Sequence, residues 1–480
     1  MGPDPGAARD VFPGMSMRSM GTRRNLVPVA LFGVLAGCAT AGPVPGGRGL
    51  PLSSPPAAAG GESLALADLA DLSAGPSLAL LLRTALERSP RILAARERAA
   101  AAAEGPVAES WLPNPQLMMG WYRTPVETRV GPQVRSLSVS QAIPFPTKLR
   151  TKARIEDAEA RRMAVVYERT TRDVLVDVVR TAFEIAYIDE AAAITGEIAP
   201  LLERYVAAAA GGETGSLLPE LFRAETQRAQ LDNDRVILAE LREAEVQHLR
   251  TLLDLPPLAP VGTPRTGGIP SVAATFAELV AIAETHSQEL REAGLALEAA
   301  SSRTSLAEQA HVPDFMVGAT RVYTDELDPS LGMNPDGNGD DPVILTVGVS
   351  IPLWAHRDAA AARRARALER AASLDRAGAV QSVRDRLARA WFGVGNAGRL
   401  ERLYDEVLVP RARIAARTAE DLVASGKGTL AGSLETIAVL HNFRLAAARA
   451  RADHGRAVAE LEGVLGRPFV LDEPGGEEAR

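Results

Sequence analysis

The chain has 480 residues, 46% of them hydrophobic but only 4% aromatic, and its formal net charge is −7. This mild charge gives no basis for nucleic-acid binding, and the single cysteine excludes an intramolecular disulfide framework or a cysteine-based zinc site. The six histidines are scattered without ligand spacing, so we expect no metal site and no cofactor. Abundant Ala, Arg and Glu favour long helices. The composition therefore predicts a mainly α-helical protein.

The N-terminus has the organisation of a bacterial signal peptide. Arg23 and Arg24 precede an apolar run over residues 26–35, which is too short to span a bilayer, and small residues then lead to Cys38. The sequence Leu-Ala-Gly-Cys resembles a lipobox, which implies removal of residues 1–37 and lipidation of Cys38, including palmitate. An ordinary signal peptide with a chance cysteine is the alternative. No later segment approaches 18 uninterrupted apolar residues, so no transmembrane helix is expected after processing.

The first half of the chain is expected to fold from Ser77 onward, after a tether rich in Pro, Gly and Ala. The Ser77 side chain can cap the first helix. Two segments then alternate apolar with small or polar residues, which predicts strands, and the second of them ends at Ile143-Pro144, where the ladder loses a donor. Helices are expected over residues 78–88, 91–108, 148–210 and 217–253, and strands over residues 116–123 and 134–143.

The same pattern returns after a linker rich in Pro and Gly. Val312-Pro313 follows Leu112-Pro113 by 200 residues, and Ile351-Pro352 follows Ile143-Pro144 by 208 residues. The sequence therefore predicts an internal duplication of helix–strand–strand–helix units. In this half we expect helices over residues 275–286, 287–309, 359–424 and 430–465, and strands over residues 315–323 and 343–351.

The four predicted strands have two unlike faces. In the second strand, Leu137 and Val139 lie on one face, whereas Ser136, Ser138 and Ser140 lie on the other. A bilayer does not tolerate open strand edges, and four strands cannot close alone. Two chains would close a barrel with a filled interior, and three would close a wider, water-filled one. A water-filled pore lined by small polar residues therefore indicates a trimer. A soluble hairpin packed on helices is the alternative.

The duplicated plan, the two Ile-Pro strand ends and the glycine turns resemble the TolC-like outer-membrane efflux channel family, over roughly residues 77–469. Residues 425–430, Ser-Gly-Lys-Gly-Thr-Leu, are similar to the second tip-and-gate segment of that family, and residues 220–224 are less closely similar to the first. The resemblance implies a lipid-anchored homotrimer in the bacterial outer membrane, extending into the periplasm. Its long coiled-coil helices would form a trimeric α-barrel below a twelve-stranded transmembrane β-barrel.

The resemblance also implies function and partners. The chain would be the outer-membrane channel of a tripartite efflux or export system, conducting substrate delivered by a periplasmic adaptor and an inner-membrane pump of the resistance-nodulation-division type. Gly215, Gly426, Lys427 and Gly428 would lie at the adaptor-contacting periplasmic tips. Three copies of Glu435 would form a gate that attracts cations by charge focusing. A solvated helix carboxylate is the alternative for Glu435.

No Ser/His/Asp or paired-carboxylate constellation emerges, so we do not expect an enzyme. The acidic run over residues 336–341 lacks the glycine and glutamate of a calcium loop and is interpreted as an acidic external loop. The alternative functions are a periplasmic lipid-anchored coiled-coil adaptor, a structural lipoprotein, or a lipoprotein enzyme. The expected divisions are the signal peptide (1–37), the tether (38–76), the first repeat (77–255), a linker (256–270), the second repeat (271–469) and a disordered tail (470–480).

Overall fold

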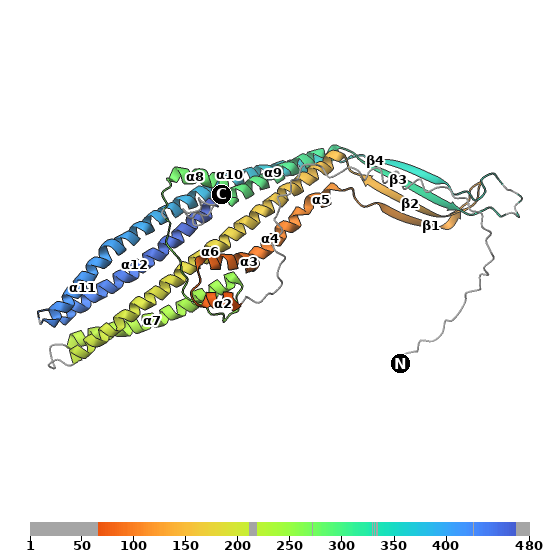
Figure 1. The fold of residues 1–480 in the computed structure, drawn as a ribbon. Coiled ribbons are helices and arrows are strands. Elements are labelled where there is room, and N and C mark those ends of the chain that lie inside the picture. Colours follow the sequence, from red (N-terminus) through yellow and green to blue (C-terminus); the bar gives the residue numbers. More distant parts are fainter. Residues whose placement is uncertain are drawn as a thin grey trace, which may run out of the picture. The chain divides into compact units, whose positions relative to one another are not determined.

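Long helices and one four-stranded sheet make up the described part of the chain (Figure 1). The computed structural model describes residues 66–210, 218–270, 272–328, 330, 332, 335–425 and 427–466. All of these belong to the unit Gly49–Arg480. The predicted signal peptide, Cys38 and the tail over residues 470–480 lie outside the described residues.

The described elements confirm a mainly α-helical chain with a small antiparallel sheet and a duplicated plan. The first repeat contains α2 (Leu66–Ser73), α3 (Leu78–Arg88), α4 (Pro90–Ala103), α5 (Gly105–Ser110), β1 (Gln116–Val126), β2 (Gln133–Ile143), α6 (Pro146–Ala210) and α7 (Leu218–Leu253). The second repeat contains α8 (Phe276–His286), α9 (Gln288–Glu308), the 3₁₀ turn η1 (Gln309–His311), β3 (Asp314–Thr324), β4 (Val343–Ser350), α10 (Ala355–Arg402), η3 (Leu403–Leu408), α11 (Val409–Ala424) and α12 (Leu430–Leu465).

Local capping explains where corresponding helices of the two repeats begin. The Ser77 hydroxyl accepts a hydrogen bond from the Leu80 backbone N–H at 3.2 Å, as predicted for the start of α3. In the second repeat Thr275 and Glu278 form a capping box at the start of α8. The corresponding short helices α3 and α8 therefore begin through different capping residues.

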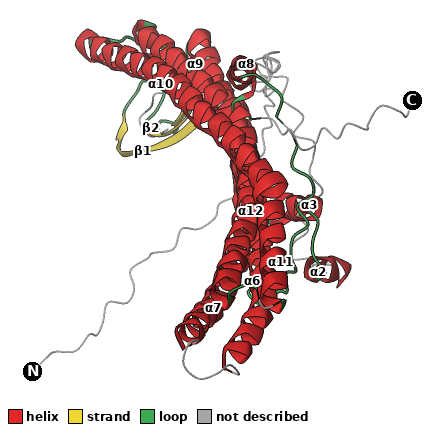
Figure 2. Cartoon of the chain, turned by 90° about the vertical axis from the view of Figure 1, so that its left-hand side faces the viewer, coloured by secondary structure: helices red, strands yellow, loops and turns green. Residues whose placement is uncertain are grey.

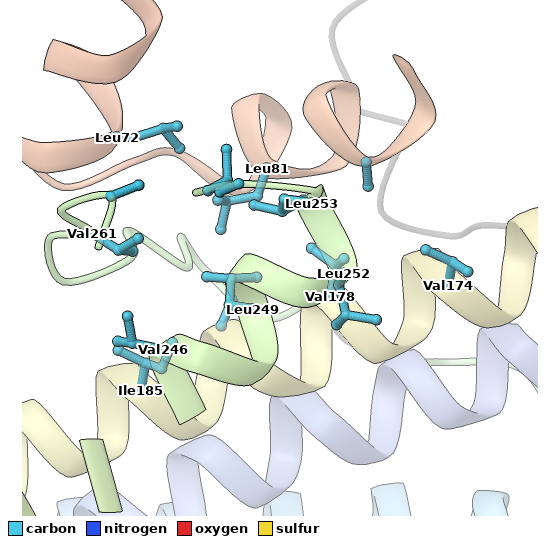
Figure 3. Close-up of a cluster of buried hydrophobic side chains, with 14 of the residues drawn as sticks. Leu72, Leu81, Val174, Val178, Ile185, Val246, Leu249, Leu252, Leu253 and Val261 are labelled. Carbon is cyan, nitrogen blue, oxygen red and sulfur yellow. The ribbon is translucent and has the colours of Figure 1, made fainter. Parts of the chain in front are cut away.

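The sequence-based start of the fold at Ser77 was wrong, because α2 precedes it. Leu72 of α2 is only 1% exposed and belongs to a hydrophobic core with Leu81 and Leu253 (Figure 3). An eight-residue helix is too short to show a convincing period, and its stability comes from tertiary packing. Residues 66–76, the last part of the predicted tether, are therefore part of the folded unit.

Two of the predicted continuous helices are interrupted. The helix expected over residues 91–108 divides into α4 and α5 at Glu104. The helix expected over residues 359–424 contains η3, a π-helical segment directly before Pro410 in the first turn of α11. Proline lacks an N–H and its ring crowds the preceding turn, which the wider π-helical turn accommodates.

The sheet is antiparallel throughout, in the order β1-β2-β3-β4. β2 and β3 pair along their whole length and so join the two repeats, whereas β1 and β4 are the edge strands. The long helices α6 and α10 begin within a few residues of the ends of β2 and β4. Both helices therefore leave the same end of the sheet.

The long helices pair into two hairpins. α6 packs along α7, and α11 packs along α12 (Figure 2). α6 has 65 residues, which corresponds to about 98 Å if straight. Leu279 of α8 lies in the second core with Leu387 of α10 and Leu461 of α12, which matches the place of Leu81 in the first core. None of the described helices is both long and apolar enough to cross a lipid bilayer.

Candidate functional site

One face of the sheet is mostly apolar, although Gln141, Arg135 and Arg321 also lie on it. Leu117 of β1 lies opposite Val139 of β2. On the same face, in the other hairpin, Val317 of β3 lies opposite Val347 of β4. Val347 is 77% exposed, although burying such side chains from water is favourable. The apolar face comprises Leu117, Met119, Trp121, Leu137, Val139, Ile143, Phe315, Val317, Ala319, Val343, Leu345, Val347 and Val349.

The opposite face carries mostly small or hydroxyl-bearing residues, as predicted. Ser138 of β2 lies between Met118 of β1 and Thr320 of β3. Met118 and Met316 are exceptions, because they lie on this face among the small residues. Met316 lies opposite Gly348, and a Cβ atom at Gly348 would lie 3.3 Å from the Met316 Cε atom. The glycine therefore leaves room for a large side chain on the otherwise small face.

Two arginines flank one aromatic ring at the loop end of the sheet, where β1 connects to β2 and β3 connects to β4. The guanidinium groups of Arg135 and Arg321 lie 4.4 Å and 5.2 Å from the ring centroid of Tyr323. Asp341 accepts a hydrogen bond from Arg321 at 2.8 Å and another from the Thr324 backbone N–H at 2.9 Å. This carboxylate of the acidic run fixes the loop to the sheet. Among the described residues, no acidic or histidine group has the arrangement of a metal site.

At the helix end of the sheet, a polar contact joins the two repeats. The Lys148 ammonium of α6 lies 3.0 Å from the Asp314 carboxylate of β3 and also donates to the Val312 carbonyl oxygen. Asp314 accepts a further hydrogen bond from the Phe145 backbone N–H at 2.9 Å. One carboxylate therefore fixes the exit of β2, the start of α6 and the start of β3.

The tip of the second helical hairpin contains two of the predicted adaptor-contact residues. Gly215 and Gly426 lie outside the described residues. The backbone N–H groups of Lys427 and Gly428 both donate to the Leu422 carbonyl oxygen at 2.9 Å, which ends α11. A Cβ atom at Gly428 would approach the backbone of residues 422–423 to about 3 Å, so this turn requires glycine. The Lys427 side chain is exposed.

Glu435, the predicted gate residue, is exposed and lies one to two turns from the start of α12. It lines a cavity of about 300 Å³ between α6, α7 and α12, together with Arg223, Gln227 and His441. Leu434 and Ile437 of α12 also line this cavity, and they belong to a small hydrophobic core. This core joins the two helical hairpins, and its members are Ile198, Ala224, Leu231, Ala416, Leu434 and Ile437.

His441 belongs to the segment that resembles the second tip-and-gate segment of the family, but sequence reasoning assigned it no role. It is only 6% exposed, and its Nε2 atom has no hydrogen-bond partner among the described residues. Burial lowers the pKa of His441 below its ordinary value, Asp234 of α7 opposes this shift, and Arg444 adds to it. The signal was present in the sequence, because His441 continues the three- and four-residue spacing of Leu434 and Ile437. The imidazole therefore packs in the interface, where burial disfavours its charged form.

Ion pairs hold α12 to its neighbours on the C-terminal side of this small core. Arg444 donates to Glu197 of α6 at 2.6 Å. Arg451 lies between Glu190 of α6, at 2.9 Å, and Asp405 of η3, at 3.3 Å. The π-helical segment is therefore tied to the first repeat through a single side chain of α12. Sequence reasoning did not anticipate this contact, because its three members are far apart in the chain.

Comparison with known proteins was made against families, curated proteins and solved structures. Residues 279–467 match the model of the outer membrane efflux protein family. No curated protein matches the chain by sequence. The fold is similar to that of VceC from Vibrio cholerae, with 17% identity and a TM-score of 0.66 over 82% of this chain and 96% of VceC. The open-state MtrE channel of Neisseria gonorrhoeae has 18% identity and a TM-score of 0.67, over 85% of this chain and 94% of MtrE. The CmeC channel of Campylobacter jejuni has 13% identity and a TM-score of 0.66, over 81% and 85% of the two chains.

The sequence match and the fold agree with each other. Residues 279–467, within the second repeat, match the outer membrane efflux protein family, and the chain has the fold of solved outer-membrane channels. The resemblance to the TolC-like outer-membrane efflux channel family is thereby confirmed. The prediction that the chain is not an enzyme is confirmed as well, because this family consists of transport channels.

Proposed function

We propose that this chain is the outer-membrane channel of a tripartite efflux or export system, and that it conducts substrate passively from the periplasm to the exterior. The observation that carries the proposal is the sheet, with an exposed apolar face, a face of small residues and two edge strands, β1 and β4. An apolar outer face against lipid and a small, polar inner face against water match the requirements of a transmembrane strand.

A homotrimer satisfies the edges of this sheet. Three copies supply twelve strands, enough for a barrel with an aqueous interior, whereas one sheet of four leaves two unpaired edges in lipid. Aromatic residues mark both ends of the apolar face: Trp121 and Tyr323 at the loop end, and Phe315 at the helix end. Such aromatic girdles are typical of the two membrane interfaces of outer-membrane barrels.

The long helices of three copies would continue the duct through the periplasm. Exposed apolar side chains on the outer sides of the two hairpins support this arrangement. Val236 and Leu241 of α7 are 57% and 49% exposed, and Phe392 of α10 and Ile414 of α11 are 63% and 66% exposed. Large side chains of this kind are available for packing against further protein. These surfaces are free to pack between neighbouring copies.

The tips would contact the adaptor and close the duct at rest. In this proposal Gly215, Gly426, Lys427 and Gly428 contact a periplasmic adaptor, which connects the channel to an inner-membrane pump of the resistance-nodulation-division type. Three copies of Glu435 line the narrow end and favour cations. The exposure of Lys427 and of Glu435 supports both assignments. A lipid on Cys38 would anchor each copy to the outer membrane.

Planar-bilayer recording tests the proposal, combined with native mass measurement in mild detergent. The purified, lipid-reconstituted protein should be trimeric and should produce discrete conductance steps. A variant with charges in the middle of the apolar face, Val317→Asp with Val347→Asp, should lose both properties while its helical content is retained. A monomeric protein without conductance would exclude the channel. A helical monomer that binds a pump directly would instead favour the adaptor function.

A further inference from the structure

The two hairpins of the sheet are copies of each other in register as well as in sequence. In the first, Gln116 of β1 lies opposite Ser140 of β2. The sequence repeat advances the first strand of the hairpin by 200 residues and the second by 208, which maps this pair onto Met316 and Gly348. Met316 does lie opposite Gly348 in the second hairpin. The offsets of the sequence repeat therefore reproduce the strand register of the second hairpin from that of the first.

The β2–β3 ladder is the only junction in the described sheet between the end of one hairpin and the beginning of the next. Ala142 of β2 lies opposite Met316 of β3, and Val139 lies opposite Ala319. The edge strand β4 is the repeat equivalent of β2, and the edge strand β1 is the repeat equivalent of β3. The ladder inside the chain is therefore a template for a ladder between two chains.

We propose that β4 pairs with β1 of a second copy of this chain in the register of the β2–β3 ladder, with Ser350 opposite Gln116 of the neighbouring copy. This inference rests on the proposed trimer and specifies its membrane interface. Applying the two offsets to the β2–β3 pairs gives the next pairs along the two strands. They are Val349 with Leu117, Gly348 with Met118, Val347 with Met119, Thr346 with Gly120, Leu345 with Trp121 and Ile344 with Tyr122, the second residue of each pair belonging to the neighbouring copy.

The side-chain pattern of the two edges supports this register. Because strand side chains alternate between faces, a one-residue slip would place every apolar residue of one strand beside small residues of the other. The inferred register places Val347 and Val349 beside Met119 and Leu117 of the neighbouring copy, apolar beside apolar. It also places Thr346 beside Gly120 on the small face. The offsets were obtained without reference to this alternation, so the agreement is independent.

The template extends to the junction between sheet and helix. Within the chain, the Asp314 carboxylate accepts a hydrogen bond from the Phe145 backbone N–H. The repeat equivalents of these two residues are Asn114 and Leu353. An asparagine side chain retains the oxygen acceptor that this contact needs. The Leu353 N–H of one copy would therefore donate to the Asn114 side-chain oxygen of the next, which closes the ring of junction contacts.

Disulfide cross-linking tests the register, since the chain has one native cysteine, at position 38. The Ser350→Cys, Gln116→Cys double variant and the Ile344→Cys, Tyr122→Cys double variant place cysteines directly opposite each other. Directly opposite Cβ atoms lie about 4.5–5.5 Å apart, close to disulfide geometry, whereas diagonal neighbours lie about 7–8 Å apart. The matched control is Ser350→Cys with Met118→Cys, a slip of two residues that preserves the faces.

Mild oxidation should convert most of each in-register variant into covalent dimers and trimers on a non-reducing gel, at least ten times more than the control. Variants that carry only one of the two added cysteines should remain monomeric on the gel. Cross-linking of the control in preference to the in-register pairs would overturn the register. A trimeric native mass without cross-linking of either in-register pair would also overturn it while leaving the channel intact. A monomeric native mass would instead reject the proposed trimer.

Discussion

The ammonium group of Lys148 lies 3.0 Å from the carboxylate of Asp314, so that the start of α6 in the first repeat is bound to the start of β3 in the second. Asp314 is also the acceptor for the Phe145 backbone N–H. The first residue of β3 therefore holds the exit of β2 and the start of α6, which lie more than 160 residues earlier in the chain. Sheet and helices are joined rigidly at this place.

Replacing Asp314 should loosen this junction. Asp314→Ala removes the acceptor of the Phe145 N–H and the charged partner of Lys148, and we expect a loss of about 1–3 kcal/mol in unfolding free energy. Asp314→Asn should lose less, because the amide oxygen still accepts from Phe145. Thermal unfolding of the detergent-solubilised protein measures both variants. Equal melting temperatures for Asp314→Ala and the unmodified protein would contradict this role.

The contact between Glu289 of α9 and Arg172 of α6 should make stability depend on pH in the acid range. Burial alone would raise the pKa of Glu289, but the hydrogen bond and the charge of Arg172 outweigh it and lower the pKa from 4.5 to about 2. A carboxyl group whose pKa is lowered in the folded state stabilises that state at pH values above its ordinary pKa. This stabilisation is lost as the pH falls from about 4.5 towards 2.

We therefore expect the melting temperature to fall over this acid range, and Glu289→Gln to remove part of the dependence. The variant should also be less stable at neutral pH, by about 1–3 kcal/mol, because Arg172 then lacks its charged partner. Exposed Glu240→Gln is the control and should preserve the acid profile. An acid profile unchanged in Glu289→Gln would assign the sensitivity to other carboxyl groups.

His441 should make the packing of the two hairpins sensitive to mild acid. Its pKa is lowered, so the packed state holds fewer protons than the unpacked state, and stability is full above about pH 6.5 and falls below it. The groups that face it are Asp234 on α7, Arg444 on α12 and, through Arg444, Glu197 on α6. Asp234 moderates the effect without reversing it.

Hydrogen exchange in α11 and α12, corrected for the intrinsic pH dependence, measures this effect. Protection near residues 434–441 should decrease between pH 7.5 and 5.5 in the unmodified protein. His441→Leu fills the same apolar site without a titrating group and should exchange equally at both values. The same loss of protection in His441→Leu would exclude the imidazole as the cause.

Glu435→Gln should reduce cation selectivity of reconstituted channels. Three carboxylates at a narrow opening concentrate cations, and the neutral amide removes that field while preserving size. Reversal potentials in a salt gradient measure the change, with Glu240→Gln as the control for total charge. An equal shift in both variants would return Glu435 to the role of an ordinary solvated carboxylate.

Cys38→Ala should abolish lipid attachment. Metabolic labelling with palmitate measures it directly, and the label should be present in the unmodified protein and absent from the variant. Labelling that persists in Cys38→Ala would remove the anchor from the proposal without affecting the sheet.

The amino-acid sequence by itself determined the strands, the long helices and their duplication. Alternation at Leu137 and Val139 and three- and four-residue spacing through Val178 and Ala182 are local patterns, and each follows directly from the geometry of its own element. The family resemblance came from such local signals too. Element ends were predicted to within a few residues where a cap or a proline marks them, as at Ser77 and Ile143.

Only the tertiary structure decided the role of residues whose partners are distant in the chain. α2 is stable because Leu72 reaches a core formed by α3 and α7, and η3 is tied through Arg451 to Glu190. His441 could be placed on an apolar face by its spacing, but its missing hydrogen-bond partner depends on what α6 and α7 bring beside it. Periodicity records which side of an element is buried. Which groups meet there depends on packing between elements, and no local pattern encodes that.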